Sequence, residues 1–198
     1  MAVQVLDIKC PGCGSPVSPD QTECEWCHRS PIIFTSFTSV YSMPVPEFNK
    51  YRRACEENVK MCPDSPTVNK GMALCFLKLK LFDKAYELFS KAMEDDVDDS
   101  ESYFYAAVCL LKGKKAFLSS KPEINQILEL MEAAVSIEER GIYYYFMAYI
   151  KYDYFKRKFL TTSPTYKDYL LLSKRFGCSA TDIDTMFKMI GVEKIAII

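Results

Sequence analysis

The chain shows two different patterns of apolar residues. Before the first cysteine, the segment VQVLDIK alternates apolar and polar positions, which is typical of a short strand. From Glu47 onward, apolar residues recur every three or four positions, which predicts amphipathic helices. The sequence therefore predicts a mainly α protein with a small β unit at its N-terminal end.

The segment from Pro66 to Asp99 predicts a pair of packed helices. Small and aromatic side chains are spaced so that the second helix can lie close against the first, with alanines where the helices cross. Similar patterns begin near Ser100 and at Gly141, and the second pattern has about seven extra residues between its helices, around GKKAFLSSKPE. The positions that carry the first pair are Met72, Ala73 and Phe76 in one helix and Ala85, Phe89 and Ala92 in the other.

The segments around these helix pairs give further predictions. Residues 47–62 predict the second helix of a preceding unit, and Ser163 and Pro164 are expected to start another helix. Ser179 and Asp182 have the spacing of a capping box at the start of a last short helix. The apolar tail VEKIAII is expected either to dock on the last helices or to bind another chain.

Residues 32–46 form the linker that precedes the helical part. They mix β-branched and aromatic residues with serine and threonine and end in two prolines, which is too apolar for a flexible tether. An extended strip packed on the neighbouring segments is expected, and addition of a strand to a partner's sheet is the alternative.

The helix pairs resemble tetratricopeptide repeats, and the resemblance is most specific in residues 66–99. Pro63 stands where such repeats usually have proline, whereas Leu74 replaces the asparagine of the version that binds chaperone tails, so that ligand is not expected. The resemblance implies an α-α superhelix of about three degenerate repeats over residues 47–198, whose concave face binds a peptide or helix segment. For the aromatic groove candidates, a place in the core is the alternative. The repeat register gives as candidate groove residues Lys70, Lys78, Phe104, Lys112, Tyr143 and Phe146.

A second motif, IKCPGCGSPVSPDQTECEWCHRSP at residues 8–31, contains two C-x-x-C pairs separated by ten residues. Two residues between paired cysteines let a tight turn direct both sulfurs at one point, and four thiolates complete the tetrahedral shell of Zn²⁺. Pro11, Gly12 and Gly14 suit such turns. The motif predicts one zinc site, with ligands Cys10, Cys13, Cys24 and Cys27.

Other functions of these residues were weighed against zinc. A redox-active pair normally begins a helix, but prolines follow both pairs, and a disulfide is less favoured in an intracellular chain. His28 replaces glycine at the second turn. It is expected to be a turn or surface residue, with an alternative metal ligand or a catalytic base as less favoured roles.

The cysteine pattern resembles the short zinc-ribbon module found at the N-termini of many prokaryotic proteins. The resemblance covers about the first 31 residues and implies a structural zinc ion in a docking element, with nucleic-acid binding in some members. Residues 1–31 carry two basic and four acidic side chains, a poor surface for phosphates. Trp26 is expected either to pack on the ribbon or its neighbour, or to anchor a partner.

Composition limits the broader functional classes. The net charge is −1, and residues 151–175 hold seven basic side chains against two acids, while residues 83–101 hold eight acids against two lysines. The start shows no secretory signal, and the longest apolar run, ten residues, is too short to span a bilayer. Nine cysteines, five of them isolated, indicate a reducing compartment, so a cytoplasmic location is expected.

The sequence therefore predicts a non-enzymatic adaptor with three parts, at residues 1–31, 32–46 and 47–198. It contains no glycine-rich phosphate loop and no recognisable nucleophile-histidine motif, and its zinc shell is closed. A nucleic-acid-associated factor, which would use the ribbon and the basic C-terminal third, is the alternative. The sequence identifies neither the protein partner nor the oligomeric state.

Overall fold

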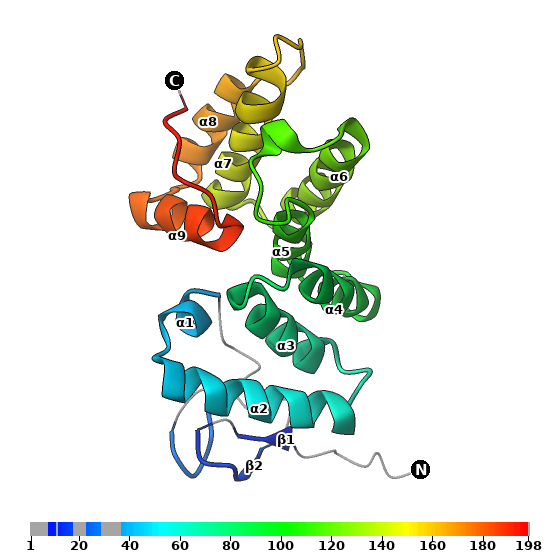
Figure 1. Ribbon diagram of the computed structural model, residues 1–198, viewed down its shortest axis with the longest axis vertical. Coiled ribbons are helices and arrows are strands. Elements are labelled where there is room, and N and C mark those ends of the chain that lie inside the picture. Colours follow the sequence, from blue (N-terminus) through cyan, green and yellow to red (C-terminus); the bar gives the residue numbers. More distant parts are fainter. Residues whose placement is uncertain (1–7, 11, 18–22, 29–36, 198) are drawn as a thin grey trace. The chain divides into compact units, whose positions relative to one another are not determined.

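The computed structural model describes residues 8–10, 12–17, 23–28 and 37–197. These residues are mainly helical, and successive helices pack as pairs (Figure 1). The chain divides into two compact units, residues 1–96 and 97–198, each with its own core. The helical segment predicted as one part at 47–198 thus extends over both units.

The described residues of the first unit contain a minimal hairpin and four α-helices. The two short strands pair antiparallel, with Ile8 opposite Val17 and Lys9 opposite Pro16. The helix α3 packs along α4, and α2 packs on α3 (Figure 1). The elements are β1 (Ile8–Lys9), β2 (Pro16–Val17), α1 (Phe37–Ser42), α2 (Val45–Met61), α3 (Pro66–Lys78) and α4 (Phe82–Asp95).

The linker prediction is wrong where the structure describes it. Residues 37–42 form the helix α1 instead of an extended strip, and α2 begins at Val45, two residues before the predicted start. Pro44 and Pro46 do not prevent this, because proline is tolerated at the cap and in the first turn of a helix. Residues 32–36 lie outside the described residues.

The predicted pairing of two helices within residues 66–99 is confirmed, since α3 packs along α4. Ala85, Phe89 and Ala92 are all buried on α4; on α3, Met72 and Ala73 are buried and Phe76 is half-buried. The alanines allow the two helix backbones to approach, and Phe89 fills the space between them.

The second unit contains five α-helices in its described residues. The pairs α5·α6 and α7·α8 pack side by side, and α9 lies against α7 and α5. In Figure 1 these are the green to red ribbons. The elements are α5 (Ser100–Leu110), the 3₁₀ turn η2 (Ala116–Leu118), α6 (Lys121–Ile137), α7 (Gly141–Ile150), the π-helical turn η3 (Lys151–Lys156), α8 (Tyr166–Arg175) and α9 (Ala180–Ile190).

Helix α7 is the centre of the second unit. Its sequence, GIYYYFMAYI, is apolar on every face, which suits a helix covered by neighbours on all sides. Tyr149 stacks edge-on against Phe187 of α9, and Tyr144 stacks on Phe176 after α8. At Gly141 a Cβ atom would lie 2.5 Å from the backbone nitrogen of Cys178, so only glycine permits the start of α7 to approach the end of α8 and the turn after it.

The insertion between α5 and α6 is anchored on α7 and η3. The backbone N–H of Ala116 donates to the Tyr149 hydroxyl at 3.2 Å, and that of Phe117 donates to the Asp153 carboxylate at 2.8 Å. Asp153 is completely buried and also pairs with Arg157. The extra residues predicted between these helices therefore form an ordered turn.

The C-terminal end follows the local prediction. Ser179 and Asp182 form the expected capping box at the start of α9. The tail after α9 contacts that helix, since Lys194 pairs with Asp184 at 2.8 Å and the N–H of Val192 donates to the carbonyl of Phe187. Within the described part of the chain, no helix has both the length and the apolar character needed to cross a bilayer.

Candidate metal centre and partner surfaces

The two C-x-x-C pairs fold into equivalent turns. In the first, the N–H of Gly14 donates to the Cys10 carbonyl at 2.8 Å, and in the second, the N–H of His28 donates to the Cys24 carbonyl at 2.9 Å. Gly14 and His28 have φ values of +80° and +55°, the left-handed conformation that closes each turn. The predicted turn role of His28 is thus confirmed.

The four cysteine sulfurs converge on one point. All four Sγ atoms lie within 4.8 Å of one another, with 3.6 Å between Cys10 and Cys27 and 3.7 Å between Cys13 and Cys24. Zn–S bonds of about 2.3 Å in a tetrahedron place the sulfurs about 3.8 Å apart. The spacing and the all-thiolate donor set therefore fit a zinc ion.

The ligands differ in their surroundings. Cys10 and Cys24 are buried, Cys27 is half-buried and Cys13 is exposed. Burial raises the pKa of the Cys10 thiol to about 12, whereas hydrogen bonding with Ser15 lowers the pKa of Cys13 to about 6. A bound cation would favour the thiolate at all four positions, because metal coordination deprotonates a thiol.

Helices of the first unit cover the buried side of the cysteine cluster. Cys10, Cys24 and Val17 form one apolar cluster with Cys62 and Val68, and Cys27 and Val59 pack against it. Cys62 directly follows α2, and Val68 lies in the first turn of α3. The metal centre is therefore attached to the helical part, a contact that the cysteine spacing does not encode.

Two side chains of the second knuckle, His28 and Trp26, are exposed to solvent. His28 is 77% exposed and its Nδ1 lies 3.2 Å from a carboxylate oxygen of Glu23. Trp26, the single tryptophan, is 73% exposed. Trp26 is therefore not packed on the ribbon or its neighbour. It has the exposed position that a partner anchor requires.

Three candidate groove residues belong to the core of the second unit, so the alternative given for the aromatic candidates is confirmed and their assignment to an open groove is wrong. Phe104, Tyr143 and Phe146 are 4%, 1% and 0% exposed. Their rings contact one another, with centroids 5.1 Å apart for Phe104 and Tyr143 and 5.6 Å apart for Phe104 and Phe146. The physical reason is the central position of α7, which buries faces that a solitary pair of helices would expose.

The lysine candidates have three different environments. The Lys78 ammonium donates to the carbonyls of Val40 and Met43 at 2.8 and 3.0 Å and lies 4.3 Å from the centre of the Phe48 ring. Lys78 therefore holds the end of α1. Desolvation lowers its pKa. Lys70 is half-buried in the first unit, and Lys112 is exposed in the second, with a φ of +50°.

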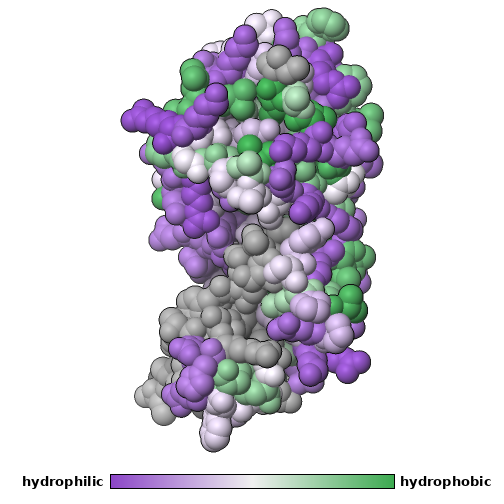
Figure 2. All heavy atoms as spheres, turned by 90° about the vertical axis from the view of Figure 1, so that its left-hand side faces the viewer, coloured by the Kyte–Doolittle hydropathy of each residue, from purple (hydrophilic) through white to green (hydrophobic). Residues whose placement is uncertain are grey.

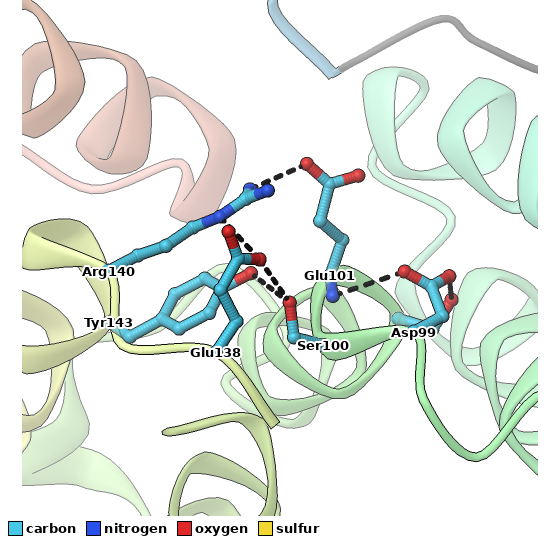
Figure 3. A network of polar contacts seen from close by, with 7 residues as sticks. Asp99, Ser100, Glu101, Glu138, Arg140 and Tyr143 are labelled. Carbon is cyan, nitrogen blue, oxygen red and sulfur yellow. Dashed lines mark hydrogen bonds and ion pairs between the residues drawn. The ribbon is translucent and has the colours of Figure 1, made fainter. Parts of the chain in front are cut away.

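A polar network joins the start of α5 to the α6–α7 turn (Figure 3). The Ser100 hydroxyl lies 2.9 Å from a Glu138 carboxylate oxygen and 3.0 Å from the Tyr143 hydroxyl. Arg140 reaches both Glu138 and Glu101 at 2.8 Å. The Tyr143 hydroxyl thus makes a hydrogen bond within the second unit.

The charges of this network shift its titration. The hydrogen bond from Arg140 lowers the pKa of Glu138, and the Ser100 hydroxyl adds to this effect. Burial raises the pKa of Tyr143 to about 12. Sequence analysis missed the network because its members are about 40 positions apart and no local motif links them.

The basic C-terminal third, the basis of the nucleic-acid alternative, is partly used within the fold. Arg157 pairs with Asp153 and lies 4.7 Å from the centre of the Phe117 ring. Lys158 lies 3.9 Å from the centre of the Tyr154 ring. Arg157 and Lys158 therefore already make contacts within the fold.

The surface in Figure 2 has hydrophilic and apolar side chains interspersed.

The two resemblances, to a zinc ribbon and to tetratricopeptide repeats, rest on motifs within this chain. When the sequence is compared with models of known protein families and with curated proteins, no family and no curated protein matches it.

Proposed function

We propose that the chain is a non-enzymatic adaptor, in which a structural zinc site stabilises an N-terminal docking element attached to a helical body that binds a protein partner. The observation that carries the proposal is the convergence of four thiolates, which supply all four ligands of a tetrahedral ion. A closed shell is typical of structural zinc, whereas a catalytic site keeps one position for water or substrate.

The residues of the site support a structural role for the ion. Cys10, Cys13, Cys24 and Cys27 would hold it, two from each knuckle. When bound, zinc supplies the cross-link between the two turns. Since the buried pair of ligands packs with Cys62 and Val68, the same cross-link fixes the docking element on α2 and α3.

We further propose that the helix pairs are degenerate tetratricopeptide-like repeats. The helices α3 and α5 begin 34 positions apart, at Pro66 and Ser100, and the second pair has the added turn η2. The buried Ala85, Phe89 and Ala92 support this proposal, because they form the small-aromatic-small contact expected inside such a repeat.

Trp26 is the proposed partner anchor of the docking element. Its ring is large, apolar and 73% exposed, and it lies on a turn that the two neighbouring ligands, Cys24 and Cys27, would fix. Large aromatic side chains on rigid supports dominate many protein interfaces, because their burial is favourable and little side-chain entropy is lost.

The proposal is tested by affinity purification of the tagged chain from its native cell, followed by mass spectrometry. Each protein recovered is then produced in pure form and titrated against the wild-type chain and the Trp26→Ala variant. We expect a direct complex that the substitution weakens by at least about thirtyfold, the typical minimum for a strong interface anchor.

Leu171→Ala is the matched control. Leu171 is an apolar residue of α8 that is 68% exposed, similar to Trp26, but it lies in the other unit. Its replacement should leave the affinity unchanged. The adaptor proposal is rejected if no purified protein forms a direct complex with the chain, and the role of Trp26 is rejected if both variants bind like the wild type.

A further inference from the structure

A cleft in the second unit, apart from the metal centre, combines cations with apolar side chains. It has a volume of about 440 Å³ and lies between η3, the loop after it and the start of α8, near the yellow to orange loop of Figure 1. Clefts of this size can hold a small ligand or a single side chain of a partner. The π-helical geometry of η3 is itself uncommon and often occurs at functional sites.

The floor of the cleft contains a buried cation. Lys151 is only 7% exposed, and its ammonium donates to the Thr162 hydroxyl at 2.8 Å. Its other close partner is the Phe155 ring, 5.0 Å away. No carboxylate lies within 4.0 Å of Lys151 in the part of the chain that the structure describes, although a buried charge is normally compensated by an opposite one.

The surrounding charges leave the cleft positive. Lys156 and Lys167 line its edge and are exposed, and none of the residues that line it is acidic. Two acids act on this region from outside the lining: Asp168, which accepts hydrogen bonds from the backbone N–H and the hydroxyl of Thr165 within the α8 capping box, and Glu132, which attracts Lys151. Lys121 adds repulsion.

The apolar wall of the cleft is unusually exposed. Phe159 is 95% exposed and has a φ of +58°, a conformation in which glycine is the usual residue at the end of a helix. Neither burial nor backbone geometry therefore explains a phenylalanine at this position. Leu160, 46% exposed, lines the same cleft.

We infer that this cleft binds a phosphate monoester that carries an aromatic group. The phosphate contacts Lys151, Lys156 and Lys167, and the aromatic group packs on Phe159 and Leu160. A phosphate with a charge between about −1.5 and −2 and three terminal oxygens matches three ammonium groups better than a carboxylate does. Phosphotyrosine and a mononucleotide share this chemistry.

The experiment is calorimetric titration of the whole chain with phenyl phosphate, with inorganic phosphate and phenylacetate as partial probes. Phenyl phosphate should bind at least about tenfold more tightly than either partial probe, because it uses both the cations and the apolar wall. Phosphotyrosine and adenosine monophosphate are titrated next. Tighter binding of one of them identifies a phosphorylated protein or a nucleotide as the source of the ligand.

Variants separate the two parts of the cleft. Lys151→Met should weaken binding of phenyl phosphate about tenfold or more, and Phe159→Ser should remove only its advantage over inorganic phosphate. Because Lys151 is buried, the exposed pair Lys156→Met and Lys167→Met provides a second test that does not disturb the core. Lys174→Met, on the exposed side of α8 and outside the cleft, is the control and should bind normally.

The inference is overturned if phenyl phosphate does not bind, if phenylacetate binds equally well, or if the Lys156/Lys167 double variant binds as the wild type does. Binding by this cleft does not require the adaptor function. The absence of a protein partner would reject that function and leave the titrations unchanged, and loss of phosphate binding would not affect the complexes tested with Trp26.

Discussion

Replacement of one zinc ligand, Cys24→Ser, should release the N-terminal element while the rest of the chain stays folded. Cys24 is completely buried and belongs to the cluster that joins the ribbon to α2 and α3. A serine at this position supplies no soft thiolate, so the site loses one of its four ligands. We expect the variant to lose stoichiometric zinc.

The magnitude follows from what else stabilises this element. Val17 is a buried aliphatic residue of β2, and complete burial of one such side chain contributes about 2 kcal/mol. Zinc binding to small structural modules contributes about 10 kcal/mol or more. The ion therefore dominates, and apolar contacts alone cannot keep the element folded.

The assay combines zinc analysis of freshly reduced protein with hydrogen exchange. Wild-type protein should contain one zinc ion, and the amides of Gly14 and His28 should be protected, since they donate to the carbonyls of Cys10 and Cys24. In Cys24→Ser both amides should exchange rapidly. The second unit, which has a separate core, should retain its protection.

Two controls use the same chemical change. Cys178→Ser, in the second unit, should retain zinc, and so should Cys62→Ser, because Cys62 packs against the cluster without belonging to the converging four. Wild-type protein without zinc, or a Cys178→Ser variant that loses the metal as Cys24→Ser does, would refute the assignment of the ligands.

Three further predictions concern helix packing, the polar network and nucleic-acid binding. Lys78→Met should lower the free energy of unfolding of the first unit by about 2 kcal/mol, because two backbone carbonyls lose a charged donor. Lys60→Met, on the exposed side of α2, is the control and should change this free energy little. Urea denaturation measures both variants. The hydrogen bond from Arg140 holds the pKa of Glu138 below its ordinary 4.5, so its contribution to stability is complete above that pH and is lost as the pH falls through the lowered pKa. Glu138→Gln should therefore remove part of the acid sensitivity of unfolding, and an unchanged pH profile would contradict this. Electrophoretic shift assays at moderate salt should show no complex with nucleic acid. The nucleic-acid alternative would be favoured by salt-sensitive binding that is lost when Lys156, Arg157 and Lys158 are replaced.

The features that sequence analysis predicted correctly depend on contacts between residues close in the chain. The turns at Gly14 and His28 need only the spacing of the cysteines and one residue that accepts a positive φ. The capping box of Ser179 and Asp182 joins residues three positions apart. Such features are set by backbone sterics and local hydrogen bonds, which the sequence displays directly.

Predictions that assigned a helix face were less reliable. The repeat register placed Tyr143 and Phe146 at a groove, but α7 is covered by several neighbours and both rings are buried. Likewise, Lys78 was expected at a partner surface and instead caps α1, a helix that was not predicted. A helical period reveals that a face is apolar, and does not reveal which element will cover it.

The sequence by itself determined the set of four converging cysteines, the mainly helical composition and the first pair of helices, because each follows from spacing within a short segment. Only the tertiary structure decided that Cys62 and Val68 support the cysteine cluster, that Arg140 joins α5 to the α6–α7 turn, and that Lys151 lies buried in a positive cleft. These contacts join residues far apart in the chain, and their geometry depends on how the helices cross.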